Sequence, residues 1–253
     1  MVTICRSALI DYVDNFLNIN KFKDYSPNGL QIEGKKNISK IVTGVSACKE
    51  LFDAAIKHDA DLILVHHGLF WFKQSMCLVG LQKKRVEQLI LKDINLAAYH
   101  LPLDAHAVIG NNVKLANSLF AKIIGALDDR SPSIGIVAEF SEPMIQEDLA
   151  LMLEKILKRK PNFWGDRERL IKKIGICTGA AQHDFNFAID LKLDAFITGE
   201  VSEFVPHLAQ ESGVGYFEAG HYATETLGIV ALGEMLAKEF DVEHQFINVE
   251  NVV

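Results

Sequence analysis

The chain is poor in residues that cross-link or anchor a protein. Its 253 residues include only four cysteines, and no two of them form a C-x-x-C pair. Such sparse cysteine predicts neither a disulfide framework nor a thiolate zinc site. Apolar runs fall short of the roughly 18 to 20 residues that cross a bilayer, and the first residues lack a basic stretch followed by an apolar signal core. We therefore expect a cytoplasmic protein without a membrane partner.

An excess of positive charge is also missing. The chain carries 26 lysines and arginines against 33 aspartates and glutamates, a formal net charge of -7. A surface of this sign repels a phosphate backbone unless positive charge gathers locally, so nucleic acid is not the expected partner. A nucleotide substrate is still compatible, because bound metal cations reverse the local field. The 49% hydrophobic content is that of a globular protein with a core.

Short apolar runs alternate with longer amphipathic ones, which is the order of strand, helix and strand in an α/β fold. In the first half the predicted strands are residues 40–47, 61–68 and 94–100, with helices at 48–58 and 83–93. In the second half the predicted strands are residues 172–179, 194–200 and 215–221, with helices at 184–192 and 202–213. One further helix is predicted from about Pro143 to Lys160. A long C-terminal helix is predicted to end at about Phe240, before a final strand at 244–249.

The two halves are related at a fixed offset. Setting Ile41 on Ile174 (174 − 41 = 133) brings further identical residues into register without a gap. The matched pairs are Lys40 with Lys173, Ala47 with Ala180, Phe52 with Phe185, Ala55 with Ala188, Ile56 with Ile189 and Asp61 with Asp194. We interpret the match as an internal duplication, although two strand-helix-strand units also share apolar positions by necessity. The expected fold is two similar α/β domains, formed by residues 1–125 with 221–253 and by residues 126–220.

A second offset, of 121 residues, sets His100 on His221 (221 − 100 = 121) and Asp104 on Glu225. Each half then carries His-x-x-x-Asp/Glu directly after an apolar strand. Side chains that leave the carboxyl ends of parallel strands face a common crevice, where ligands bind in such sheets. A functional site is therefore expected in the cleft between the two domains.

Two adjacent histidines, His66 and His67, end the apolar run 61–68. Side chains on a regular strand alternate between its faces, so the strand has to end there if both rings are to enter one pocket. Gly68 follows and lets the backbone turn sharply. The pattern fits a pair of metal ligands and also a pair of hydrogen-bonded core histidines.

Three more residues have the chemistry of metal ligands. His221 and Glu225 are four residues apart where a helix is expected to begin, so they share one helical face. Asp104 supplies a carboxylate that can bridge two cations. Taken singly, a His/Glu pair at this spacing is also typical of a surface interaction, and an aspartate before a helix is typical of a cap.

The combination is more specific than its parts. Three imidazoles and two carboxylates suit zinc, iron, manganese or nickel better than calcium. Five protein ligands leave open positions on two divalent metal ions, which is an arrangement that activates water for hydrolysis. His100 is the candidate proton shuttle, or else a satisfied buried histidine. Glu203 is a weaker acid-base candidate, and with Glu200 and His207 it either lines the same cleft or forms a solvated helix start.

Several of these segments together resemble the family called GTP cyclohydrolase 1 type 2, or Nif-three-like, in its short bacterial form. The segments are DYSPNGLQIEG, DLILVHHGLFW, YHLPLDAH with GNN, ITGEVSE and EAGHYATETLGI, in matching order from about Tyr25 onward. The resemblance implies a toroidal homohexamer, built as a trimer of dimers. It also implies a dinuclear metal site at His66, His67, Asp104, His221 and Glu225.

The family name implies hydrolytic opening of the GTP purine ring. For this reaction we take His100 as the candidate catalytic acid-base residue and Glu203 as the weaker candidate. Because the chain has no Walker lysine loop and no Rossmann glycine fingerprint, GTP would be held by the metals, Asn28, Gln31 or local loops. Two other functions fit the same residues. One is a non-catalytic metal-binding or protein-interaction protein, and the other is a metal-dependent phosphoesterase.

Overall fold

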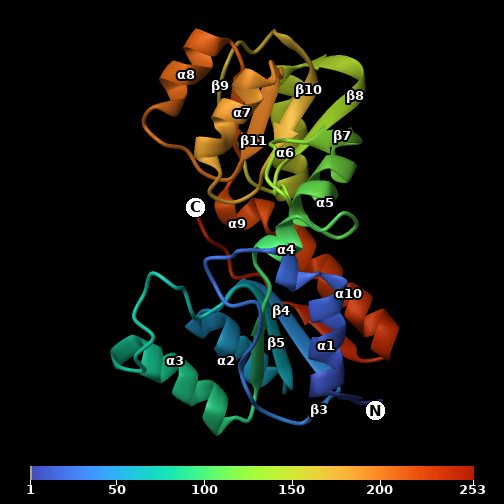
Figure 1. Cartoon of the computed structure of the whole chain (residues 1–253), viewed down its shortest axis with the longest axis vertical. Coiled ribbons are helices and arrows are strands. Elements are labelled where there is room, and N and C mark those ends of the chain that lie inside the picture. Colours follow the sequence, from blue (N-terminus) through green and yellow to red (C-terminus); the bar gives the residue numbers. More distant parts are fainter. Residues whose placement is uncertain (1) are drawn as a thin grey trace. The chain divides into compact units, whose positions relative to one another are not determined.

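The computed structural model describes residues 2–253 and contains two α/β units (Figure 1). Unit 1 is Met1–Leu103 with Gly228–Val249, and unit 2 is Asp104–Leu227 with Glu250–Val253. Each unit is built on its own sheet with helices packed against it. The mixed α/β class predicted from the alternation of apolar and amphipathic runs is confirmed. No helix in residues 2–253 is long and apolar enough to cross a membrane.

The main sheet of unit 1 has five strands in the order β13-β4-β5-β6-β2. Its strands are β4 (Lys40–Ser46), β5 (Leu62–His67), β6 (Asn95–Ala98), β13 (Glu243–Phe246) and the antiparallel edge strand β2 (Gly29–Ile32). The helices are α1 (Arg6–Phe16), η1 (Ile19–Lys21), α2 (Lys49–Lys57), α3 (Gly80–Leu91) and most of α10 (Thr226–Phe240), and β1 (Ile4–Cys5) pairs separately with β3 (Asn37–Ile38). Strands β4 and β5 are apolar along most of their length because helices bury both sheet faces.

The sheet of unit 2 has six strands in the order β7-β8-β10-β11-β12-β9. Its strands are β7 (Lys122–Ala126), β8 (Ile136–Ile145), β9 (Asn162–Trp164), β10 (Leu170–Ile176), β11 (Ala195–Thr198) and β12 (Gly215–Glu218), of which β10, β11 and β12 run parallel. The helices are α5 (Asn111–Ser118), α6 (Gln146–Leu157), η2 (Gln182–Asp184), α7 (Phe185–Asp190), α8 (Val205–Ser212) and α9 (His221–Thr224), while α4 (Leu101–Asp104) joins the units. Two apolar cores lie against this sheet.

The alternating strands and helices predicted for residues 40–100 and 172–221 are all found. The part of unit 2 that precedes residue 172 differs from expectation, because residues 122–164 include three strands that were not predicted from the sequence. The helix predicted from about Pro143 begins only at Gln146, since Pro143 lies in β8.

The division into units also differs from the expected boundaries at residues 125 and 221. The chain leaves unit 1 at Leu103 and returns at Gly228. The physical reason is packing: Leu115 and Leu119 of α5 are fully buried in a core of the second unit. An amphipathic helix belongs with the sheet that buries its apolar face, and sequence order alone does not show which sheet that is.

The strand pairings of the two units match at the offset that the identical residues indicated. In unit 1 Ile41 pairs with Leu62, and in unit 2 Ile174 pairs with Ala195, so both partners differ by 133 residues. This agreement is what a duplication predicts and supports that interpretation.

The second offset needs a correction of one residue. Val65 pairs with Ala98, and its counterpart Thr198 pairs with Glu218, which gives an offset of 120 rather than 121 (218 − 98 = 120). The counterpart of His100 is therefore Gly220, not His221. The sequence comparison matched His100 with His221 because both are histidines. Only the strand register shows that their positions differ by one residue.

Asp61 and Asp194, which the first offset equates, hold the first parallel strand of each sheet in the same way. Asp61 Oδ2 accepts the backbone N–H groups of Ser39 at 2.9 Å and Lys40 at 3.2 Å. Asp194 Oδ2 accepts the N–H groups of Lys172 and Lys173, both at 2.8 Å. A carboxylate at this corner therefore satisfies strand-end donors in both units.

We expect Asp61→Asn to lower the free energy of unfolding at pH 7 by about 1 to 3 kcal/mol, because it weakens charge-assisted hydrogen bonds. Burial raises the pKa of Asp61, but hydrogen bonds from Lys35 and Ser39 lower it overall. A lowered folded-state pKa stabilises the fold above the unfolded value of about 3.9 and ceases to do so as pH falls through the folded value. Urea unfolding should therefore show the difference shrinking below about pH 4. Asp190→Asn, at an exposed position, is the control, and a difference independent of pH would contradict the argument.

Candidate metal centre

The paired histidines of unit 1 lie at the carboxyl end of β5. His66 is fully buried, and its Nδ1 donates to the carbonyl oxygen of Tyr99 at 2.9 Å. His67 Nδ1 forms a hydrogen bond with Ser46 Oγ at 3.1 Å. Strand β5 ends at His67, as the sequence predicted. The two rings form hydrogen bonds with Tyr99, just after β6, and with Ser46, at the end of β4, and their centroids lie 4.7 Å apart.

His100 joins this pair from the end of β6. One ligand atom of each of His66, His67 and His100 lies within 4.8 Å of the others. Nδ1 of His100 is hydrogen-bonded to Asp24 Oδ1 at 2.7 Å. The Nδ1 atoms of His66 and His67 are likewise hydrogen-bonded, to Tyr99 and Ser46 respectively. We infer that Nε2 is the nitrogen that each ring presents to the group, and partners of this kind orient imidazoles that bind metals.

In unit 2 the candidate ligand His221 begins α9, directly after β12. Its Nδ1 lies 2.6 Å from Glu200 Oε1, and its Nε2 lies 3.2 Å from Glu225 Oε2. The expected i,i+4 contact is present, but α9 ends at Thr224 and α10 begins at Thr226, so Glu225 lies at the break. Burial would lower the pKa of His221, but the hydrogen bonds and charges of Glu225 and Glu200 raise it to about 9.

Asp104, also in unit 2, is 4% exposed and is held by a buried network. Its Oδ1 accepts Asn111 Nδ2 at 2.8 Å and Thr178 Oγ1 at 3.4 Å. Asn112 ties the backbones together, since its Nδ2 donates to the Asp104 carbonyl at 3.3 Å and its Oδ1 accepts the Thr178 N–H at 2.8 Å. The side chain of Asp104 is therefore oriented by residues of the GNN motif.

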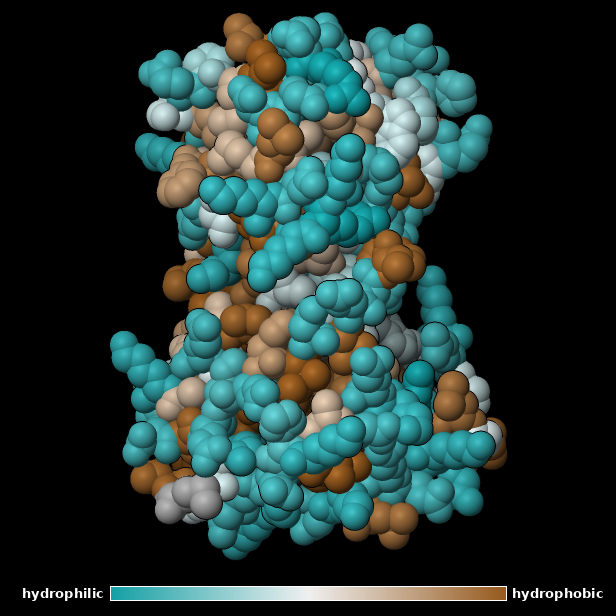
Figure 2. Space-filling model, turned by 180° about the vertical axis from the view of Figure 1, so that it is seen from behind, coloured by the Kyte–Doolittle hydropathy of each residue, from teal (hydrophilic) through white to brown (hydrophobic). Residues whose placement is uncertain are grey.

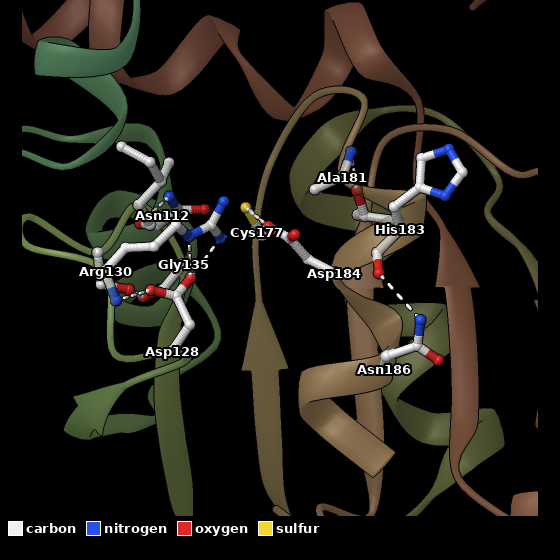
Figure 3. Close-up of polar contacts among 12 residues, drawn as sticks. Asn112, Asp128, Arg130, Gly135, Cys177, Ala181, His183, Asp184 and Asn186 are labelled. Carbon is white, nitrogen blue, oxygen red and sulfur yellow. Dashed lines mark hydrogen bonds and ion pairs between the residues drawn. The ribbon is translucent and has the colours of Figure 1, made fainter. Parts of the chain in front are cut away.

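The loop before β8 completes this support (Figure 3). Asn112 Nδ2 also donates to the carbonyl oxygen of Ile134 at 2.9 Å. Arg130, in the same loop, pairs with Asp128 and reaches Asp184 at 2.7 Å. The thiol of Cys177 lies beside Asp184, and burial raises its pKa well above the usual value. The thiol is thus neutral and packs as part of the core, whereas the arginine clamps the loop to η2.

Gly179 allows close approach of the backbone to Glu225. Its φ is +72°, and a Cβ added there would lie 2.3 Å from Glu225 Oε1. The segment is pinned by Thr198 Oγ1, which donates to the Gly179 carbonyl at 3.0 Å, and by Thr224 Oγ1, which accepts the Gly179 N–H at 3.2 Å. Only glycine fits this position without displacing the carboxylate or straining the backbone.

Other residues singled out from the sequence have different environments. The side chain of Glu203 is 91% exposed and lies 3.8 Å from His207, as in a solvated helix start. Asn28 bonds to Asp24 and to the backbone of His100, and Gln31 bonds to the backbones of Pro27 and Leu69. These amides therefore hold loops together.

Sequence reasoning missed Asp24, Ser46, Tyr99, Asn111 and Asn112 as partners of the candidate ligands. Only the DYSPNG and GNN motifs carried a signal for some of them.

Comparison with known proteins decides the family. The model of the Duf34/NIF3 (NGG1p interacting factor 3) family matches residues 4–252. The chain belongs to the Duf34/NIF3 family. A relative in Haemophilus influenzae, named GTP cyclohydrolase 1 type 2 homolog, is 48% identical over 94% of this chain and 96% of its own length. A relative of the same name in Pseudomonas aeruginosa is 43% identical over 99% of both chains.

Two solved structures are similar to this chain over nearly its whole length. The structure of the protein ybgI, described as of unknown function, is 40% identical with a TM-score of 0.94 and covers 99% of this chain and 100% of that one. The structure of a protein from Thermus thermophilus is 32% identical with a TM-score of 0.89 and the same coverage. The resemblance stated from the sequence motifs is confirmed.

We expect Gly179→Ala to weaken binding of divalent metal by about 10- to 100-fold, as displacement of groups around a metal site does. Gly80→Ala is the matched control, because Gly80 also has a positive φ, +54°, but no atom lies within 4 Å of an added Cβ. Both variants incur the backbone penalty, so a similar small loss of stability is expected. Equal metal affinity of the two variants, measured by isothermal titration calorimetry, would rule out the close-approach argument.

Proposed function

We propose that this Duf34/NIF3 protein is a metal-dependent hydrolase that acts on a small molecule, with opening of the GTP purine ring as its activity. In this proposal His66, His67, Asp104, His221 and Glu225 are the ligands of two divalent metal ions. The observation that carries the proposal is that His66 and His67, each tied to the protein through Nδ1, present ligand atoms in one group within 4.8 Å, with His100 beside them as the acid-base residue.

The donor set fits first-row metal ions. His66 is buried and Glu225 is 2% exposed, so water competes weakly for their ligand atoms. Imidazole with carboxylate is the borderline combination preferred by zinc, iron, manganese and nickel. The carboxylate of Glu200 beside His221 and the carbonyl of Tyr99 beside His66 are partners of the kind that fix ligating histidines.

Two such ions, when bound, would polarise an electrophilic group of the substrate and lower the pKa of water toward roughly 7. In the proposed reaction, water adds at C8 of the guanine ring as His100 takes its proton. His100 returns the proton to the ring nitrogen as the bond from C8 to that nitrogen breaks, so hydroxyl and hydrogen of one water are both accounted for. The geometry favours His100 for this role over the solvated Glu203.

The names of the relatives support GTP as the first substrate to test. The homohexamer that the resemblance implied and a cytoplasmic location belong to the proposal as well. Apolar side chains on the surface support an assembly, because Phe120 is 86% exposed and Leu91 is 77% exposed. Figure 2 shows apolar patches among the hydrophilic residues of one face. Light scattering of the purified protein tests the oligomeric state.

We expect His66→Ala and His67→Ala to fold while retaining less metal than the wild type, because each removes one ligand at a strand end. Glu225→Ala should lose more metal than Glu200→Ala, since Glu200 acts through His221. Glu203→Ala, at a solvated position, is the control. Elemental analysis of protein purified without chelators measures the effect, and full occupancy in both histidine variants would restore the interpretation of these residues as core histidines.

The activity is tested by incubating metal-loaded and metal-free protein with GTP. Loss of the purine absorption with the loaded form alone is the expected result. Release of phosphate with an intact purine ring would instead favour the phosphoesterase, and bound metal without any turnover would favour a metal-binding or interaction protein.

A further inference from the structure

Asp24 is a buried carboxylate to which the proposed chemistry gives no role. Its side chain is 4% exposed, and its Oδ1 lies 2.7 Å from Nδ1 of His100. The same oxygen accepts the N–H of Tyr25 at 2.6 Å, while Oδ2 accepts Asn28 Nδ2 at 2.9 Å and the N–H of Leu101 at 3.0 Å. Four donors therefore converge on one side chain.

The ionisation state of Asp24 decides which nitrogen of His100 carries a proton. Burial raises the pKa of Asp24, but hydrogen bonds led by that of His100 lower it overall, so the group is ionised at neutral pH. An ionised carboxylate only accepts hydrogen bonds, so Nδ1 of His100 has to be the donor. Nε2 is then the nitrogen that faces His66 and His67, within the group spanning 4.8 Å.

The ring of His100 is held on other sides too. Its backbone N–H donates to Asn28 Oδ1 at 2.8 Å. Trp71 packs edge-on against the imidazole, with centroids 5.2 Å apart and planes at 80°. Asp24 and Asn28 thus fix both the ring and the backbone of His100 from one short loop. A ring held in this way needs little reorganisation when it gains a proton.

We propose that Asp24 is a positioning residue that holds His100 with Nε2 directed at the attacking water. The inference rests on the proposed hydrolysis and adds to it the group that selects the tautomer of the base. As the oxygen of water bonds to carbon, its proton passes to Nε2, and the charge of Asp24 stabilises the resulting imidazolium. The proton then leaves Nε2 for the nitrogen whose bond to carbon breaks.

The tautomer can be measured without any substrate. Nitrogen–proton correlation NMR of zinc-loaded protein carrying ¹⁵N-histidine distinguishes the two neutral forms, and His100→Gln identifies the His100 signals by their loss. The expected result is a proton on Nδ1, with Nε2 not bonded to zinc. A neutral ring protonated on Nε2, or an Nε2 coordinated to zinc, would overturn the inference.

A second arm uses Asp24→Asn. Its amide can keep an oxygen toward Leu101 and Asn28, but then it presents N–H to His100 and favours the opposite tautomer. The expected turnover of GTP falls about 100-fold or more, within the range of lost acid-base catalysis, with KM and metal content unchanged. Asp53→Asn is the control, because Asp53 accepts hydrogen bonds from Lys49 and Gln88 at a half-exposed site of the same unit.

The outcomes separate the two proposals. Wild-type turnover by Asp24→Asn, or loss of metal from it, would contradict the positioning role while leaving the hydrolase intact. If the metal-loaded wild type opens no purine ring, the proposed function fails, and the NMR result alone then decides whether Asp24 sets the tautomer of His100.

Discussion

The hydrogen bond from His66 Nδ1 to the carbonyl oxygen of Tyr99 is the contact on which the candidate centre of unit 1 depends. It joins the ends of β5 and β6, whose ladder runs up to the pair of Val65 with Ala98. A carbonyl at the end of a sheet cannot move without breaking that ladder, so the backbone itself orients the ring. His67 is anchored in turn to Ser46 at the end of β4. The ends of β4, β5 and β6 thus position the imidazoles of His66 and His67, while Asp24 anchors that of His100.

Equivalent strands of the two units carry residues of different chemistry at the same positions. At the first offset Gly199 and Glu200 occupy the positions of His66 and His67. A Cβ on Gly199 would lie 2.5 Å from the Cα of His221, so glycine there admits the start of α9 against the strand end. Glu200 then bonds to Nδ1 of His221. One unit therefore supplies imidazoles from the strand, while the other supplies space and a carboxylate for an imidazole from the next helix.

In two places the structure differs in detail from the prediction made from the sequence. The helical pair of His221 and Glu225 kept its contact across a break between α9 and α10, because Tyr222, Ala223 and Thr224 are buried and hold the turn in place. The offset between equivalent residues of the two repeats is 133 in the first two parallel strands and 120 in the third. It changes because the connection from the second strand to the third is shorter in unit 2. Matching residue types in the sequence do not reveal that the offset is 120 and not 121, because only the strand pairing distinguishes the two.

The sequence by itself determined the α/β class, the parallel strands, the family and the candidate ligands, because apolar periodicity and clustered histidines and carboxylates are local signals. Tertiary structure decided which sheet α5 joins, which nitrogen of each histidine is engaged, and that Asp24 meets His100 although 76 residues separate them. These features depend on packing and on hydrogen bonds between distant segments, and no local pattern encodes either.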